Sequence, residues 1–191
     1  MLLLTRLAVA EDPPPESAWR VWFEPKFLHS ATTAPIADAQ QTEFAGGVRG
    51  RDLLTVLSKE TFAKLNVTWS EFFAKARANS TSDFVALKPE YVRNRKKVIQ
   101  YAVLQSEEPF VASAVLAPKF LETFADTLGP KVLVIIPNQF TAYVFPALAS
   151  AYQDFEPVIR KAYRDTAHPV STEVFEFSAE GIKAVGAFES P

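Results

Sequence analysis

The chain has 191 residues, of which 48% are hydrophobic and 22% are charged, and its formal net charge is −2. This composition is typical of a globular protein that can bury a sizeable core. The absence of cysteine excludes disulfides, thiolate metal sites and cysteine nucleophiles, and the slightly negative charge gives no indication of a polyanionic partner.

The sequence shows neither an export signal nor a membrane span. The apolar run MLLLTRLAVA has no basic region before its leucines, and Arg6 interrupts it. No apolar run approaches the roughly 20 residues that a spanning helix requires. We therefore expect a cytoplasmic protein that does not contact a membrane.

The first 50 residues are poorly patterned. Residues 1–9 predict a β-strand that ends before the prolines at 13–15, and residues 19–25 predict a second strand. Residues 26–50 are rich in Ala, Thr, Gln and Gly and are predicted to be loop, with at most one irregular segment. Within them GGVRGR (46–51) combines flexible amides with two arginines, so a phosphate-binding loop is the alternative to a plain mobile loop.

Helical patterns begin near residue 58. Ser58 is a candidate N-cap for a helix over 58–65. Thr68 and Glu71 have capping-box spacing and predict a helix over 69–78 that ends at Asn79. Residues 96–104 have strand composition, residues 110–117 are compatible with a strand or a helical turn, and a helix over 118–128 begins at a proline and ends before Gly129.

The stretch KVLVIIPNQFTAYVFP (131–146) predicts a hairpin. Pro137 to Gln139 form its structural bend, with Phe140 packed, and the continuously apolar residues 132–136 predict a central strand covered on both faces. A helix over 154–166, capped by Asp154, has an apolar stripe expected to pack on that strand; the stripe consists of Phe155, Val158, Ile159, Ala162 and Tyr163.

A second hairpin is predicted over 173–188, with its turn at Ala179-Glu180-Gly181. Helices mixed with hairpins predict an α+β fold with a largely antiparallel sheet. The length suits one domain over 1–191, divided into a poorly patterned part over 1–50 and a well-patterned part over 51–188.

Four sequence blocks resemble a bacterial family of unknown function typified by YtpQ. They are VLSKETFAKLNVTWSEFFAKARAN, FVASAVLAPKFLETFADTLG, KVLVIIPNQFTAYVF and HPVSTEVFEFSAEGIKAV, and together they cover about residues 50–188. The resemblance implies an arrangement of elements, because the family has no established activity. The family commonly places an Asp directly after the bend, where this chain has Phe140.

No sequence motif for catalysis is present. The chain lacks a Gly-x-Ser-x-Gly elbow, a Walker loop and a Gly-x-Gly-x-x-Gly fingerprint. His29 and His168 are not spaced as metal ligands, and His168 follows a predicted helix, where interaction with the helix dipole is favoured over a role as general base. The adjacent Glu107 and Glu108 suit a solvated turn better than one half of a carboxylate pair. We expect no cofactor and no metal.

Two groups of residues are candidates for binding. Arg93, Arg95, Lys96 and Lys97 form the only dense basic cluster, near Tyr91 and Tyr101, but the net charge argues against nucleic acid as its ligand. The other group is an aromatic set that either packs in the core or anchors a partner, with Tyr143, Phe145 and Tyr152 as the possible interaction surface.

The leading hypothesis is a non-enzymatic protein-binding or accessory domain. The alternative is a hydrolase-like enzyme with a site assembled from distant loops around His168 or carboxylates. The catalytic residues of such a site, the identity of a partner and the oligomeric state are not indicated by the sequence.

Overall fold

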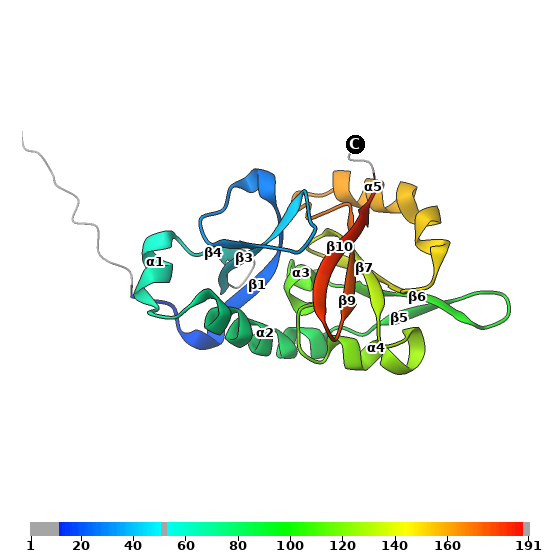
Figure 1. Ribbon diagram of the computed structural model, residues 1–191, viewed down its shortest axis with the longest axis horizontal. Coiled ribbons are helices and arrows are strands. Elements are labelled where there is room, and N and C mark those ends of the chain that lie inside the picture. Colours follow the sequence, from blue (N-terminus) through cyan, green and yellow to red (C-terminus); the bar gives the residue numbers. More distant parts are fainter. Residues whose placement is uncertain (1–11, 51–52, 189–191) are drawn as a thin grey trace, which may run out of the picture.

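The computed structural model describes residues 12–50 and 53–188 and has an α+β architecture, as predicted, with two antiparallel sheets (Figure 1). The smaller sheet contains β1 (Trp19–Pro25), β2 (Thr33–Pro35), β3 (Thr42–Arg49) and β4 (Leu54–Val56). The larger sheet contains β5 (Glu90–Arg93), β6 (Ile99–Gln105), β7 (Val132–Asn138), β8 (Thr141–Pro146), β9 (Glu173–Ser178) and β10 (Gly181–Ala187). The helices are α1 (Lys59–Lys64), α2 (Trp69–Ala86), α3 (Val111–Ala114), α4 (Phe120–Leu128) and α5 (Glu156–Arg164).

Strand β7 lies inside the larger sheet, whose strand order is β10-β9-β7-β8-β6-β5. Its side chains alternate between two apolar clusters. Val132, Val134 and Ile136 belong to the main core, which also includes residues of the smaller sheet, α2 and α4. Leu133 and Ile135 lie on the other side of the sheet, in a second cluster beneath α5. The predicted central strand covered on both faces is confirmed.

Helix α5 covers this second face as its apolar pattern predicts. Ile159 has no exposed surface and packs with Leu133 and Ile135. Val158 does not belong to the buried face, although the predicted apolar stripe includes it, because its side chain is 46% exposed. The helix begins later than predicted, after a 3-10 turn over Ser150–Phe155, so its N-cap is Phe155 rather than Asp154.

The prediction that residues 26–50 are loop is wrong. Strand β3 is the centre of the smaller sheet. It pairs with β1 along the whole length of β1, from Trp19↔Val48 to Pro25↔Thr42. Gly46 and Gly47 suggested a loop, but they allow close packing. A Cβ atom at Gly46 would lie 2.7 Å from the Trp69 ring, and one at Gly47 would lie 2.1 Å from the Thr55 carbonyl oxygen. The GGVRGR motif therefore lies mainly in a strand and not in a mobile loop.

Helix α2 is longer than predicted. The capping box is present: Glu71 N–H donates to Thr68 Oγ1 at 3.3 Å, and Thr68 N–H donates to a Glu71 carboxylate oxygen at 2.8 Å. The helix continues past Asn79, however, to Ala86. The Asn79 amide instead donates to the carbonyl oxygen of Glu16 at 2.7 Å, so its side chain serves a tertiary contact and not a helix end.

The two sheets are joined by polar contacts between segments far apart in the chain. Thr42 Oγ1 and Ser171 Oγ lie 2.6 Å apart, and Glu173 Oε1 accepts from Gln40 N–H at 2.6 Å. Ala184 N–H of β10 donates to the Ala37 carbonyl oxygen at 2.8 Å, next to an isolated parallel bridge between Ala37 and Lys183. These contacts place the segment around Ala37 against the outer edge of β10.

Among the described residues, no helix is both long and apolar enough to cross a bilayer. The strand predicted over residues 1–9 lies outside the described residues.

Candidate functional site

The turn between β7 and β8, formed by Gln139 and Phe140, is a junction between segments. Asn138 is 7% exposed; its side-chain oxygen accepts from Phe140 N–H at 2.9 Å, and its amide nitrogen donates to the Ala162 carbonyl oxygen of α5 at 2.9 Å. Gln139 uses its backbone, donating to His168 O and accepting from Val111 N–H. The Phe140 ring is half-buried and meets the His168 ring edge-on at 5.7 Å. These contacts are structural, as predicted, but the turn itself is shifted toward the C-terminus: Pro137 and Asn138 belong to β7, and Asn138 pairs with Thr141 across the turn.

The three residues of the predicted interaction surface occupy different environments. Phe145 has no exposed surface and contacts Tyr101, Tyr152 and Phe155 with ring centroids 5.1–6.4 Å apart. It is therefore a core residue in this structure and is not available to a partner. Tyr143 and Tyr152 are half-buried, so any contact made by this set belongs to those two side chains.

Tyr143 belongs to a larger surface that sequence reasoning did not identify. Strand registers place Val92, Tyr101, Val103 and Tyr143 together on the α5 side of β5, β6 and β8: Val92 pairs with Tyr101, and Val103 pairs with Tyr143. All four are only half-buried. The Phe155 ring contacts both tyrosines, with its centroid 4.6 Å from that of Tyr101 and 6.4 Å from that of Tyr143, and it covers them only in part. We call these four residues the platform.

The platform is uncharged at neutral pH, with Glu90 at its margin. Burial, and next the nearby Glu90 carboxylate, raise the pKa of Tyr101 above its ordinary value of 10.0. Burial, and next the neighbouring Tyr101, raise the pKa of Tyr143 in the same direction. Both phenols therefore keep their protons and can donate hydrogen bonds. Tyrosines in this state present an apolar ring and a polar tip, which suits a protein interface.

A hydrogen-bonded basic turn adjoins the platform. The β5–β6 hairpin projects from the body of the molecule (Figure 1). At its tip, Asn94 Oδ1 accepts from Lys96 N–H at 2.9 Å and from Val98 N–H at 3.0 Å, and Lys97 adopts a left-handed conformation with φ 64°. The basic turn consists of Arg93, Arg95, Lys96 and Lys97, all of them exposed. No carboxylate in the described part of the chain forms an ion pair with any of the four.

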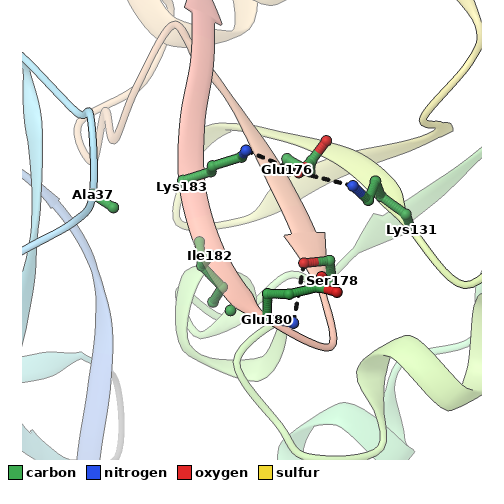
Figure 2. Close-up of a pocket in the computed structure, with 8 residues that line it drawn as sticks. Ala37, Lys131, Glu176, Ser178, Glu180, Ile182 and Lys183 are labelled. Carbon is green, nitrogen blue, oxygen red and sulfur yellow. Dashed lines mark hydrogen bonds and ion pairs between the residues drawn. The ribbon is translucent and has the colours of Figure 1, made fainter.

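A separate pocket of about 270 Å³ lies beside the β9–β10 turn (Figure 2). Figure 2 shows Lys131 and Lys183 converging on Glu176; each ammonium lies 3.3–3.4 Å from the same carboxylate oxygen. Glu180 adds a second carboxylate, and its pKa is lowered by the Ser178 hydroxyl first, with smaller contributions from the two lysines. Two positive and two negative groups cancel, so this pocket has no clear charge preference for a ligand.

The predicted catalytic alternatives do not converge. His29 and His168 are both exposed, and within the described residues neither imidazole is hydrogen-bonded to a carboxylate. Glu107 and Glu108 are both exposed, as expected of a solvated turn, and the Glu108 carboxylate accepts from Arg49 at 2.6 Å. In the same part of the chain, no group of three or more His, Asp or Glu side chains has metal-binding geometry.

Arg49 belongs to an ion network that the sequence did not reveal. Asp83 on α2 is 4% exposed and binds both Arg20 of β1, at 2.8 Å, and Arg49 of β3. The Arg49 guanidinium also stacks over Phe110 at 4.5 Å. All these charges are paired within the protein, so the network fastens α2 to the smaller sheet and leaves no unpaired charge for a substrate.

No family model, no curated protein and no solved structure matches this chain. The resemblance to the YtpQ-like family therefore stays a prediction.

Proposed function

We propose that the protein is a non-enzymatic, protein-binding or accessory domain of the cytoplasm, and that the platform is its contact surface. The observation that supports this proposal is the incomplete cover of the larger sheet. One face is closed by α5 over β7 but carries the incompletely buried Val92, Tyr101, Val103 and Tyr143 over β5, β6 and β8.

The chemistry of the platform favours a protein partner. Two tyrosines beside two valines combine apolar area with hydrogen-bonding hydroxyls, and tyrosine is enriched among the residues that dominate interface energies. The strands fix these side chains in place, so little conformational entropy is lost when a partner binds. Beside the platform, β5 is the last strand of the sheet, and peptides often bind at such an edge.

Site-specific photo-crosslinking in the cells that naturally contain the protein tests the proposal. A crosslinking residue at Val92 should capture a discrete protein, and Tyr143→Ala should abolish the capture. The same crosslinker at Glu122, an exposed position on α4, is the control and should capture nothing comparable. Equal capture at both positions, or none at Val92, would contradict the proposal.

A further inference from the structure

We propose that the partner presents an acidic, extended segment, which pairs with the free edge of β5 and places its carboxylates against the basic turn. This inference rests on the proposed function and specifies the chemistry of the partner. Its grounds are the distribution of charge along β5, the sheet edge and the adjoining platform.

Positive charge is concentrated around β5. Lys88 precedes the strand, and Arg93, Arg95, Lys96 and Lys97 follow within it and in the turn, against the single acidic Glu90, although the whole chain has a net charge of −2. All five basic side chains are exposed. A segment lying along β5 would therefore meet positive charge at both ends. Acidic residues on the partner would complement it.

The turn is preorganised for this role. The two hydrogen bonds accepted by Asn94 Oδ1 fix the backbone that carries Arg95 and Lys96, and the Arg93 guanidinium donates to the Lys97 carbonyl oxygen at 3.1 Å. Because the backbone is already ordered, binding costs less entropy than it would on a mobile loop. The exposed charges should also accelerate association at low ionic strength.

The edge of β5 is open within the described residues, since only β6 pairs with it. Its unpaired peptide groups are a template for an added strand. A second copy of this chain is a poor occupant, because it would bring two clusters of five basic residues together, and like charges in an interface are unfavourable. A partner of opposite charge satisfies both the backbone groups and the basic side chains.

The surroundings favour a peptide over nucleic acid. Along a nucleic acid, phosphates extend in a continuous row and require many cations for affinity. Here the basic residues end at the platform, where Val92 and Val103 offer aliphatic contacts instead of further cations. An extended peptide with alternating acidic and apolar side chains matches this arrangement, because alternate side chains of a strand point to opposite faces.

The experiment uses a fluorescent ten-residue peptide in which Glu and Val alternate, with a Lys and Val peptide as its charge control. Anisotropy titration of the full chain at low salt should show saturable binding of the acidic peptide alone. Arg95→Glu/Lys96→Glu should weaken that binding about tenfold or more, because two attractive charges become repulsive. Lys59→Glu/Lys119→Glu makes the same charge change at exposed sites outside the hairpin and should leave binding nearly unchanged.

Amide hydrogen exchange then locates the contact. Alternate residues within Glu90–Arg93 should exchange more slowly when the acidic peptide is bound, since a new strand protects one set of amides. Equal binding of both peptides, equal effects of the two double variants, or unchanged exchange in β5 would overturn the inference. Displacement of the acidic peptide by a short DNA duplex at lower concentration would overturn it in favour of nucleic acid.

The two proposals fail in different ways. If Val92 captures a partner in cells but the acidic peptide does not bind, the charge assignment is wrong and the binding function stands. If neither occurs, both proposals fall.

Discussion

The two halves of one sheet face differ in what covers them. Beneath α5, Leu133, Ile135 and Val174 are at most 6% exposed, whereas Val103 and Tyr143, on neighbouring strands of the same face, are half-buried. Both halves carry apolar side chains, so their composition does not distinguish core from surface. The difference lies in the reach of α5 and the 3-10 turn before it. A residue of the same type is therefore a packing element in one half and a candidate contact in the other.

The largest effect is expected where the cover is complete. Ile159→Ala should lower the free energy of unfolding by about 2–5 kcal/mol, because it removes buried methyl groups and leaves a cavity. Chemical denaturation measures this change. Val158→Ala, on the adjacent and 46% exposed residue, should cost much less; if the two costs were equal, the assigned orientation of α5 would be wrong.

The attachment of α5 to the bend gives the next effect. Asn138→Asp keeps the acceptor for Phe140 N–H but removes the amide that donates to Ala162 O. An unsatisfied buried group costs about 1–3 kcal/mol, so stability should fall by an amount in that range. Thermal and denaturant unfolding measure the loss. A neutral result would show that α5 is held by apolar packing alone.

A matched pair of substitutions tests the comparison directly. Val174→Thr places a hydroxyl in the covered half and should cost about 1–3 kcal/mol, because a buried polar group without a partner is unfavourable. Val103→Thr places it on the platform, where water can solvate it, and should cost about 0.5 kcal/mol. Denaturation of both variants gives the difference. Equal costs would mean that the platform is as closed as the core.

The platform tyrosines predict an alkaline effect. Because folding raises the pKa of Tyr143 above 10.0, its neutral form contributes stability below the unfolded pKa, and this contribution is lost as pH rises through the folded pKa. Tyr143→Phe should therefore flatten the decline in stability above about pH 10, with little change at pH 7. Denaturation curves from pH 7 to 11 provide the measurement. A decline as steep as that of the parent chain would assign the effect to other groups.

The smallest effect is expected at Gln139, in the turn between β7 and β8. Its described hydrogen bonds use backbone atoms, so Gln139→Ala should change stability by at most about 0.5 kcal/mol and leave partner binding intact. Differential scanning calorimetry and the crosslinking assay test the two parts. Lost binding without lost stability would make the bend part of the contact surface.

Local chemistry predicted the elements whose signals are local. The Thr68–Glu71 capping box, the two hairpins and the buried side of α5 follow from spacing within a few residues. Strand β3 was missed because Gly46 and Gly47 have low strand propensity, and the reason for them, contact with Trp69 and Thr55, is tertiary. The prediction that α2 ends at Asn79 is wrong for a similar reason, because the role of the Asn79 side chain is a tertiary contact with Glu16.

The candidate site was predicted only in part. The basic residues of the turn and Tyr143 were identified from the sequence, but their proximity depends on strand register. Tyr143 and Phe145 are two residues apart and face the same side of β8. The alternation of side chains along a strand therefore cannot predict that Phe145 is buried while Tyr143 is only half-buried. Phe145 is buried because Phe155 and Tyr152 lie over it, and no local pattern encodes that contact.

The segment around Ala37 limits how many strands the larger sheet can accept. By bonding to Ala184 N–H, it blocks the middle of β10 and leaves β5 as the open side of the described sheet. A sheet open on both sides can be extended by chain after chain into a filament. When only one side is open, each chain pairs directly with one added strand, and copies of this chain cannot be joined through both sides of their sheets. The expected stoichiometry is therefore one segment per chain, which favours a discrete heterodimer over open-ended assembly.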